Sequence, residues 1–388
     1  MSEYNYYIKS KDVLNLLLAD EKRSHFLTER LSYRIYDNAT ILPHNRSTST
    51  LSGGVITKNG VFIENTALHE EYYDGSYSYK KEDVIISEKT AVFLGSWINI
   101  YGHAITDNIK KLWFLFTDEG LQLLNNTLGV DIVYICLSRD NIAANYVKDI
   151  ISTIGLDFSR FENITQITQY KNVIVPDNSL ILKGGMRYFT SDFLSIIERI
   201  KCNCHSTFLY NSIYLTRSYI HDNKDYNEKL IESEFEKRGY KVISPERLNF
   251  REQVALMKNC TRIVTTVGSV SHNILFCNDN TQVVLLNKAN YVNGYQQAIN
   301  KMHLLKIIYI DAHRSIRKQQ PWTGPFFLWV TPELCKFLDM KSKPYYFSTS
   351  WYNYLYSFVW EYTIRPWLFN FLGPLMITCR QHIKKLLV

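Results

Sequence analysis

The chain has 388 residues, of which 46% are hydrophobic and 21% are charged, and nine are prolines. This composition excludes a disordered or collagen-like protein, and the length favours two domains over a single core. The net charge of +7 suits anionic ligands. Because no dense arginine-rich tract is present, nucleic acid is not an expected partner.

The first segment, from Met1 to Ser24, contains one short apolar run, Leu14 to Ala19, with Lys and Asp on either side. Such a run predicts neither a signal peptide nor a membrane span. We therefore expect the chain to stay in the cytoplasm, with its seven scattered cysteines as reduced thiols. The rest of residues 1–80 mixes polar turns with tyrosine-rich stretches, which predicts an irregular, β-containing entry.

Strands and helices alternate from about Val84 onward. The predicted strands are Ala91–Leu94, Ile132–Leu137 and Val173–Pro176, and the predicted helices are 103–117, 141–153 and 191–201. Alternation of this kind is typical of a parallel sheet. We assign residues 1–205 to an N-terminal α/β domain.

Residues 206–312 show a clearer succession of the same kind and predict a second, Rossmann-like domain. Its predicted strands are 212–215, 240–243, 263–267, 283–286 and 305–310, separated by helices that carry Tyr226 to Phe235, 250–258 and 271–277. The fold class expected is therefore α/β, with two Rossmann-like domains and a cleft between them.

Residues 313–388 do not continue the alternation and predict a helical, aromatic and basic extension. Its rings are Trp322, Phe326, Phe327, Trp329, Trp351, Tyr352, Tyr354, Trp360, Trp367, Phe369 and Phe371, and its basic end is Arg380, Lys384 and Lys385. The apolar run Phe358 to Ile377 is interrupted by Glu361, Arg365 and two prolines, so we do not expect it to span a membrane. Two interpretations stay open: residues 345–388 lie at a membrane surface, or a helix pair packs on the first domain.

The segment Asn99 to Asn108 carries a histidine and an aspartate four residues apart, His103 and Asp107. On a helical wheel, Ile105 groups with the apolar residues that follow it, while His103, Asp107 and Lys110 fall on the opposite side. The pair is therefore either part of a solvated helix surface or one wall of a cleft, with a general base and its partner.

A second block begins where a predicted strand ends. Arg217 follows the strand 212–215, at the edge of an α/β sheet where ligands bind, and a guanidinium there can hold a diphosphate through two hydrogen bonds. The turn at Gly268 and Ser269 offers backbone amides to an anion. No Asp-x-Asp motif follows a strand, and no three-glycine dinucleotide fingerprint follows an early one.

Taken in order, these features resemble glycosyltransferase family 61. The resemblance covers about 90 to 310 and rests on these matches: Gly102-His103-x-x-x-Asp107-Asn108, Arg217-Ser218, Asn227-Glu228, Glu252-Gln253 and the turn Gly268-Ser269-Val270-Ser271-His272-Asn273. The family turn usually has an apolar residue where His272 stands. His272 either approaches the donor phosphates with its imidazole or is a surface side chain.

The resemblance implies a GT-B fold and inverting transfer from a nucleotide sugar, often in the synthesis of surface glycans such as capsule or O-antigen. The implied base is Asp107 or His103, with the carboxylate as first choice. The implied donor-binding residues are Arg217, Asn227, Glu228, Gly268, Ser269, Ser271, His272 and Asn273. Cationic groups and backbone amides suffice for the leaving group, so we expect no metal or other cofactor.

The expected partners are a nucleotide-sugar donor and a glycan or lipid-linked glycan acceptor. The extension at 345–388 fits an enzyme that acts at the inner face of the cell membrane. A second interpretation stays open, in which the chain is a non-catalytic nucleotide-binding protein that organises a polysaccharide assembly. Such a protein needs no base, so turnover of a nucleotide sugar distinguishes it from a glycosyltransferase.

Overall fold

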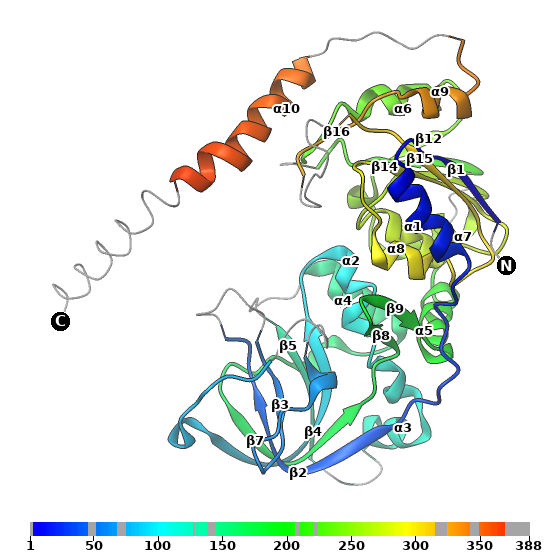
Figure 1. Cartoon of the computed structure of the whole chain (residues 1–388). Helices are drawn as coiled ribbons and strands as arrows, with labels where there is room; N and C mark the ends of the chain where they lie inside the picture. The colour runs from blue at the N-terminus through cyan, green and yellow to red at the C-terminus, as the bar shows by residue number, and fades with distance from the viewer. Residues whose placement is uncertain are drawn as a thin grey trace.

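The computed structural model describes residues 3–45, 52–67, 75–126, 129, 131–138, 144–205, 210–220, 223–314, 324–341 and 349–368. They form a mixed α/β structure with two six-stranded sheets and two smaller two-stranded ones. Figure 1 shows the two large sheets one above the other, each with its own helices.

The first large sheet has the strand order β3-β2-β7-β4-β5-β6. Its strands are β2 (Tyr33–Leu42), β3 (Gly54–Ile56), β4 (Ile85–Trp97), β5 (Ile132–Ser138), β6 (Phe161–Glu162) and β7 (Thr168–Pro176). Strand β2 is antiparallel to β3 and β7, whereas β7, β4, β5 and β6 are parallel. The three strands predicted here are confirmed and extend further than the apolar runs that revealed them. The run Ala91 to Leu94 is fully buried, as expected for a central strand covered on both faces.

The second large sheet is parallel throughout, in the order β1-β15-β14-β13-β10-β12. Its strands are β1 (Glu3–Tyr7), β10 (Ser212–Leu215), β12 (Lys241–Ile243), β13 (Arg262–Thr266), β14 (Gln282–Asn287) and β15 (Lys306–Asp311). The succession predicted for residues 206–312 is confirmed strand by strand.

Strand β1 lies in a different place from the one predicted. The sequence places residues 1–205 in one domain, but β1 pairs with β15 at the edge of the second sheet, with Glu3 opposite Lys306 and Tyr7 opposite Ile310. Helix α1 (Lys11–Glu21) follows it, and β2 then enters the first sheet. The local sequence does not predict this pairing, because a short strand can join either sheet and its partner β15 lies far along the chain.

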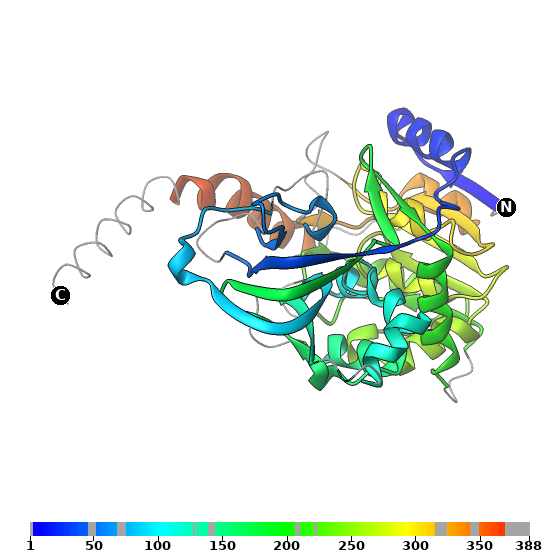
Figure 2. The ribbon, with the colours of Figure 1, turned by 90° about the horizontal axis from the view of Figure 1, so that it is seen from below.

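The view from below shows α1 at the side of the molecule, away from the strands of the first sheet (Figure 2). The helices that matter for the site lie mostly between the two sheets (Figure 1). They are α2 (Tyr101–Ala104), α3 (Asp118–Leu124), α4 (Asn145–Ile154), α5 (Ser191–Cys202), α6 (Glu228–Glu236), α7 (Phe250–Asn259) and α8 (Gly294–Ile299), with the hairpin β8 (Leu180–Lys183) and β9 (Met186–Phe189) before α5. Helix α7 begins with a capping box in which Asn249 and Glu252 satisfy each other's backbone amides. The predicted helix at 271–277 is a 3₁₀ segment, Ser271–Phe276.

The single amphipathic helix predicted over 103–117 is wrong. The segment forms α2 and two 3₁₀ turns, Asp107–Ile109 and Leu112–Phe116. The helix stops because Thr106 leaves the helical conformation and Asn108 exchanges hydrogen bonds with the backbone of Ile98. The polar side is buried as well: Lys110 and Lys111 are 3% and 0% exposed, and the ammonium group of Lys111 donates to the Pro176 carbonyl. The interpretation of His103 and Asp107 as part of a solvated helix surface is therefore excluded.

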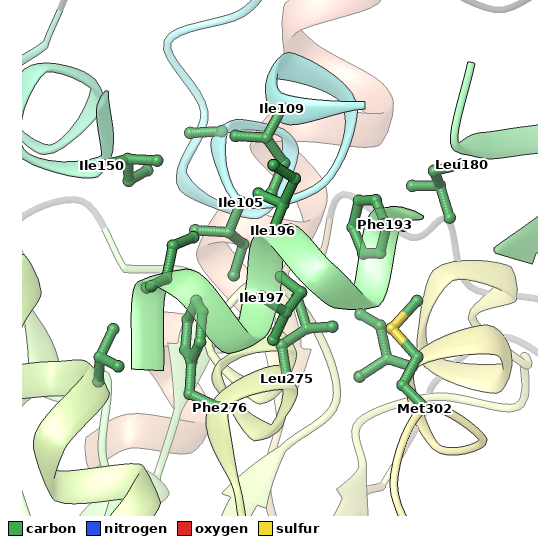
Figure 3. Packing of buried hydrophobic residues seen from close by; sticks show 14 of the residues in the cluster. Ile105, Ile109, Ile150, Leu180, Phe193, Ile196, Ile197, Leu275, Phe276 and Met302 are labelled. Atoms are coloured by element: carbon green, nitrogen blue, oxygen red, sulfur yellow. The ribbon is translucent and has the colours of Figure 1, made fainter. Parts of the chain in front are cut away.

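The first half of the molecule is built on the first large sheet and the second half on the second large sheet. One hydrophobic cluster continues from the first half into the second. Figure 3 shows its centre, where Phe193, Ile196 and Ile197 of α5 lie between side chains from the two halves. Ile105 and Ile109 come from the segment after β4, and Leu275, Phe276 and Met302 come from the second half. The two sheets are therefore held in a fixed relation by a shared core.

Strands β11 (Asp225–Tyr226) and β16 (Phe326–Phe327) form a short parallel pair. Helix α9 (Pro332–Phe337) follows β16. Helix α10 (Thr349–Val359) continues through a π-helical turn, Trp360–Ile364. Helix α10 packs Trp351 and Tyr354 on Phe327 and then extends away from the body of the molecule (Figure 1). It contacts β11 and β16. Among the predicted residues of the extension, Trp322, Phe369, Phe371, Arg380, Lys384 and Lys385 lie outside the described residues.

Candidate active site

The segment after β4 places His103 and Asp107 side by side. Their hydrogen bond joins His103 Nδ1 to Asp107 Oδ2 over 2.6 Å. The His103 side chain is 25% exposed, whereas that of Asp107 is 5% exposed. The pair is therefore a partly accessible imidazole held by a buried carboxyl group, an arrangement that suits proton transfer.

A tyrosine from the other half of the molecule completes this pair. Tyr295, in α8, donates its hydroxyl to Asp107 Oδ2 over 2.6 Å, and its ring meets the His103 ring edge to face. The guanidinium of Arg187, from β9, lies 3.3 Å from the centre of the Tyr295 ring. Burial raises the pKa of the Tyr295 hydroxyl, and the nearby Asp107 charge adds to this, so the tyrosine keeps its proton and acts as a donor.

The turn from Gly268 to Asn273 packs directly against α2. Tyr101 donates its hydroxyl to Asn273 Oδ1 over 2.5 Å. A Cβ atom on Gly102 would lie 2.9 Å from His272 Nδ1 and 3.0 Å from Ser269 Oγ, so only glycine allows this approach. Helix α2 and the Gly268 to Asn273 turn lie far apart along the chain but thus form one wall, the shared wall.

Ser271 holds the shape of this turn. Its hydroxyl oxygen accepts from the Gly268 amide over 3.0 Å and lies 2.7 Å from the Gly268 carbonyl, and the residue is fully buried. Gly268 has φ of +149°, a conformation that favours glycine. Ser271 therefore shapes the loop, and a direct contact with a ligand is not its role in this geometry.

His272 is buried between the turn and α2, with 5% of its surface exposed, which excludes the surface interpretation. Neither ring nitrogen has a hydrogen-bond partner of good geometry among the described residues. Burial lowers the pKa of His272 to about 3, with the neighbouring His103 as a second cause. The imidazole is therefore neutral at physiological pH.

This pKa predicts an acid-sensitive fold. Between about pH 6.5 and 3 the unfolded chain binds a proton at residue 272 that the folded chain excludes, so the free energy of unfolding should fall as the pH falls. The slope from one such group is at most about 1.4 kcal/mol per pH unit. We expect His272→Gln to remove this contribution, measured as the difference from the unchanged protein in urea unfolding at pH 7, 6 and 5.

The exposed His205 offers the control, because His205→Gln should leave the acid slope in place. Equal slopes in the unchanged protein and in His272→Gln would contradict the prediction.

Two cations flank one buried carboxylate at the carboxyl edge of the second sheet. Arg217 follows β10 and Lys288 follows β14. Lys288 Nζ donates to both oxygens of Asp225 over 3.1 Å, and Arg217 Nη1 donates to Asp225 Oδ2 over 3.2 Å. Burial lowers the pKa of Lys288, while Asp225 opposes this effect. Two positive groups and one negative group leave the cluster with an excess of positive charge.

The predicted pair Asn227 and Glu228 supports this cluster from behind. Glu228 is 1% exposed, and its Oε2 accepts the Arg217 backbone amide over 3.1 Å. Burial raises the pKa of Glu228 to about 8, with the charges of Asp225 and Glu232 as further causes. Asn227 donates its side-chain amide to the Leu328 carbonyl over 2.9 Å. In this geometry Glu228 fixes the backbone at Arg217, whereas Asn227 ties the start of α6 to the segment after β16.

A cavity of about 520 Å³ opens between the two halves. The first half contributes Tyr101 and Tyr146, and the second contributes Arg217, Phe250 and Asn273. The full lining is Ile100, Tyr101, Asn145, Tyr146, Asp149, Arg217, Ile220, Pro245, Glu246, Leu248, Asn249, Phe250, Gln253, Ser269, Val270 and Asn273. Aromatic walls with a guanidinium suit a ligand with a planar apolar part and an anionic part.

The structure thus brings together only some of the predicted site residues at the cavity. Arg217, Ser269 and Asn273 line it, and His103 lies two residues beyond the lining residue Tyr101. Gly268, Ser271 and His272 belong to the turn that forms this wall with α2, Glu228 accepts the backbone amide of Arg217, and Asn227 bonds to the Leu328 carbonyl. Within the described residues no group of three His, Cys, Asp or Glu side chains is placed to hold a metal ion.

Sequence reasoning missed four residues of the site: Arg187, Asp225, Lys288 and Tyr295. The rule that pointed to Arg217 also applies to Lys288, which comes two residues after the predicted strand 283–286 and directly after β14. Tyr295 and Arg187 carry no such signal, because Tyr295 reaches Asp107 only through the packing of α8, and Arg187 of β9 stacks on Tyr295.

A family model described as Glycosyltransferase 61 matches residues 101–284 of the chain. The match begins at the first residue of α2 and ends within β14, so it includes His103, Asp107, Arg217 and the Gly268 turn, whereas Lys288 and Tyr295 lie beyond it. No curated protein matches the chain.

Proposed function

Because residues 101–284 belong to glycosyltransferase family 61, the protein is a glycosyltransferase, and we propose that it inverts the anomeric centre as it transfers a sugar from a nucleotide-sugar donor to a hydroxyl group. The observation that carries this proposal is the shared wall formed by α2 and the Gly268 turn, because α2 contributes Tyr101 to the Arg217 cavity and His103 to the dyad of His103 and Asp107. Inverting transfer requires a base and a diphosphate site that reach the same anomeric carbon from opposite sides.

The two sheets support a GT-B arrangement. Each sheet has its own helices, and the cavity is lined by residues from both halves. In this proposal the donor nucleotide lies in the cavity, with its base or ribose among Tyr101, Tyr146 and Phe250 and its diphosphate at Arg217.

His103 is the better candidate for the base, in contrast to the preference for Asp107 drawn from the sequence. The imidazole is the more accessible group, whereas Asp107 is buried and its Oδ2 already accepts two hydrogen bonds. The acceptor hydroxyl gives its proton to His103 as its oxygen bonds to the anomeric carbon, and the bond from that carbon to the phosphate oxygen breaks. Asp107 stabilises the resulting imidazolium.

The leaving nucleoside diphosphate carries away the electron pair of the broken bond. Arg217 lines the cavity and is kept in place by Asp225, and the backbone of Gly268 and Ser269 lies in the shared wall. These cationic and amide groups supply the stabilisation of negative charge that the departing diphosphate needs. We propose on this basis that no metal or other cofactor is required.

The acceptor proposed is a surface-polysaccharide intermediate, of capsule or O-antigen type, and the site of action is the cytoplasmic side of the cell membrane. Support comes from the surface-glycan role that the family resemblance implies and from the aromatic helix α10. Among the described residues, none of the helices has both the length and the apolar character to cross a bilayer.

Helix α10 supports a peripheral contact with lipid. Tyr356 of α10 is 70% exposed, and Trp367, in the helical residues that follow the π-helical turn, is 61% exposed. Exposed tyrosine and tryptophan side chains favour the interface of a membrane. Replacing both (Tyr356→Ser with Trp367→Ser) should weaken binding to phosphatidylglycerol vesicles by about tenfold or more, measured by co-sedimentation.

A matched double variant removes exposed apolar side chains elsewhere: Ile35→Ser with Ile86→Ser, at 56% and 64% exposure. An equal loss of vesicle binding in the two double variants would contradict a specific role for α10.

The function itself is tested with the purified protein and a panel of nucleotide sugars. A donor should raise the melting temperature, because a ligand that binds only the folded state stabilises it. Incubation of that donor with glycan acceptors should then yield a product whose anomeric configuration, read by NMR, is opposite to that of the donor. A donor that binds without turnover would instead favour the non-catalytic assembly protein, and retention of configuration would overturn the inverting mechanism.

A further inference from the structure

Tyr295 lies outside the family match and yet donates a hydrogen bond from the second half to Asp107 of the dyad. Its hydroxyl and His103 Nδ1 both lie 2.6 Å from the same atom, Asp107 Oδ2. The two donors also lie close to each other, with 3.5 Å between Tyr295 Oη and His103 Nδ1. A carboxylate oxygen that receives two donors is stabilised in its ionised form and shares its negative charge between them.

The ring of Tyr295 is fixed on both sides. The Arg187 guanidinium stacks on it at 3.3 Å, and the His272 ring lies 5.7 Å away on the neighbouring turn. A tyrosine held in this way cannot turn its hydroxyl elsewhere without breaking the stack.

Helix α8 is anchored to the second half by a chain of side-chain hydrogen bonds. Asn293 accepts the backbone amides of Tyr295 and Gln296 over 3.0 and 3.1 Å. Gln296 then accepts from Ser271 over 2.5 Å and donates to Asn300 over 2.9 Å. The position of the Tyr295 hydroxyl is therefore set by the same turn that lies against Gly102.

We propose that Tyr295 is a positioning residue, which fixes Asp107 Oδ2 and limits how strongly this carboxylate attracts the proton of His103. The inference rests on the proposed function, in which His103 is the base. A base that binds its proton too tightly is occupied near neutral pH and releases the proton slowly after each turnover. The hydroxyl of Tyr295 shares the negative charge of Asp107 Oδ2 and so weakens the attraction of this carboxylate for an imidazolium at position 103.

The testing variant is Tyr295→Phe, which removes the hydroxyl and keeps the ring that Arg187 stacks on. Without the second donor, Asp107 attracts the imidazolium more strongly, and we expect the pKa of His103 to rise by about half a unit to one unit. NMR titration of the imidazole signals measures this shift, with the His103 signal identified by its absence in His103→Gln.

Tyr6→Phe is the matched control, because Tyr6 also donates to a carboxylate, Glu21 Oε2 over 2.9 Å, far from the dyad. It should leave the His103 titration in place. A second measurement repeats the comparison in an Asp107→Asn background, where the effect of Tyr295→Phe should disappear. No shift in Tyr295→Phe, an equal shift in Tyr6→Phe, or a shift that persists in the Asp107→Asn background would each overturn the proposal.

The titration needs neither donor nor acceptor, which separates this inference from the proposed function. A shift of the His103 titration in a protein that transfers no sugar would support the positioning role and contradict the function. Once a donor is known, the acid limb of kcat/KM against pH should move upward in Tyr295→Phe by the same amount as the titration.

Discussion

Sugar transfer should fall by about 10² to 10⁴-fold when His103 is replaced by glutamine, because a positioned general base contributes about that factor. Glutamine keeps a polar side chain beside Asp107 but cannot take the proton of the acceptor hydroxyl. Donor affinity should change little, since His103 is not among the residues that line the Arg217 cavity. Initial rates at saturating donor, with donor affinity from thermal shift, measure the two effects separately.

Asp107→Asn is the companion to this experiment. It should also lower the rate, but by less, if the carboxylate acts through His103. A larger loss in Asp107→Asn than in His103→Gln, with donor binding unchanged, would identify the carboxylate as the base. His205→Gln, at an exposed position, should retain the full rate.

The largest expected change in stability comes from Asp225→Asn. This substitution leaves Lys288, which is 4% exposed, without the charge of its carboxylate partner. Breaking a buried ion pair by removal of one member costs about 3–5 kcal/mol. We expect a loss of this size in the free energy of unfolding, measured by urea denaturation, together with weaker donor binding because Arg217 loses the same partner.

The same substitution at the surface gives the comparison. Asp131 pairs with Lys89 across 3.9 Å, with its side chain 73% exposed, and Asp131→Asn should cost less than about 1 kcal/mol. If the two variants lost similar amounts, the Asp225 cluster would not carry the stability assigned to it. The double variant Asp225→Asn with Lys288→Met should be more stable than Asp225→Asn alone, because it leaves no ammonium unpaired.

The alternation of strands and helices in residues 206–312 could be predicted because each element there is defined by its own residues. The strand 283–286 is an apolar run, and helix α7 begins with Asn249 and Glu252, a signal readable from spacing alone. Where the chain relies on distant partners, prediction fails. The helix expected over 103–117 breaks because Asn108 bonds to the backbone of Ile98, a contact that the 3.6-residue period does not encode.

The site divides in the same way. Arg217 could be found because it follows a strand, and His103 with Asp107 because they stand four residues apart. Tyr295 could not, because its hydroxyl reaches Asp107 only after α8 packs on the Gly268 turn. The burial of His272 depends on the absence of a side chain at Gly102, and such a dependence between distant positions is invisible in a single sequence.

Strand β1 has a consequence for the solution behaviour of the protein. It pairs along β15, whose residues Ile307 to Ile310 are buried, and it thereby covers what would otherwise be the open edge of a parallel sheet. An uncovered edge of apolar strand is a template for pairing with another chain. The five residues of β1 therefore place a strand with exposed Glu3 and Asn5 at the edge of the sheet in place of the apolar β15, and any fusion placed before them has to leave β1 free to pair with β15.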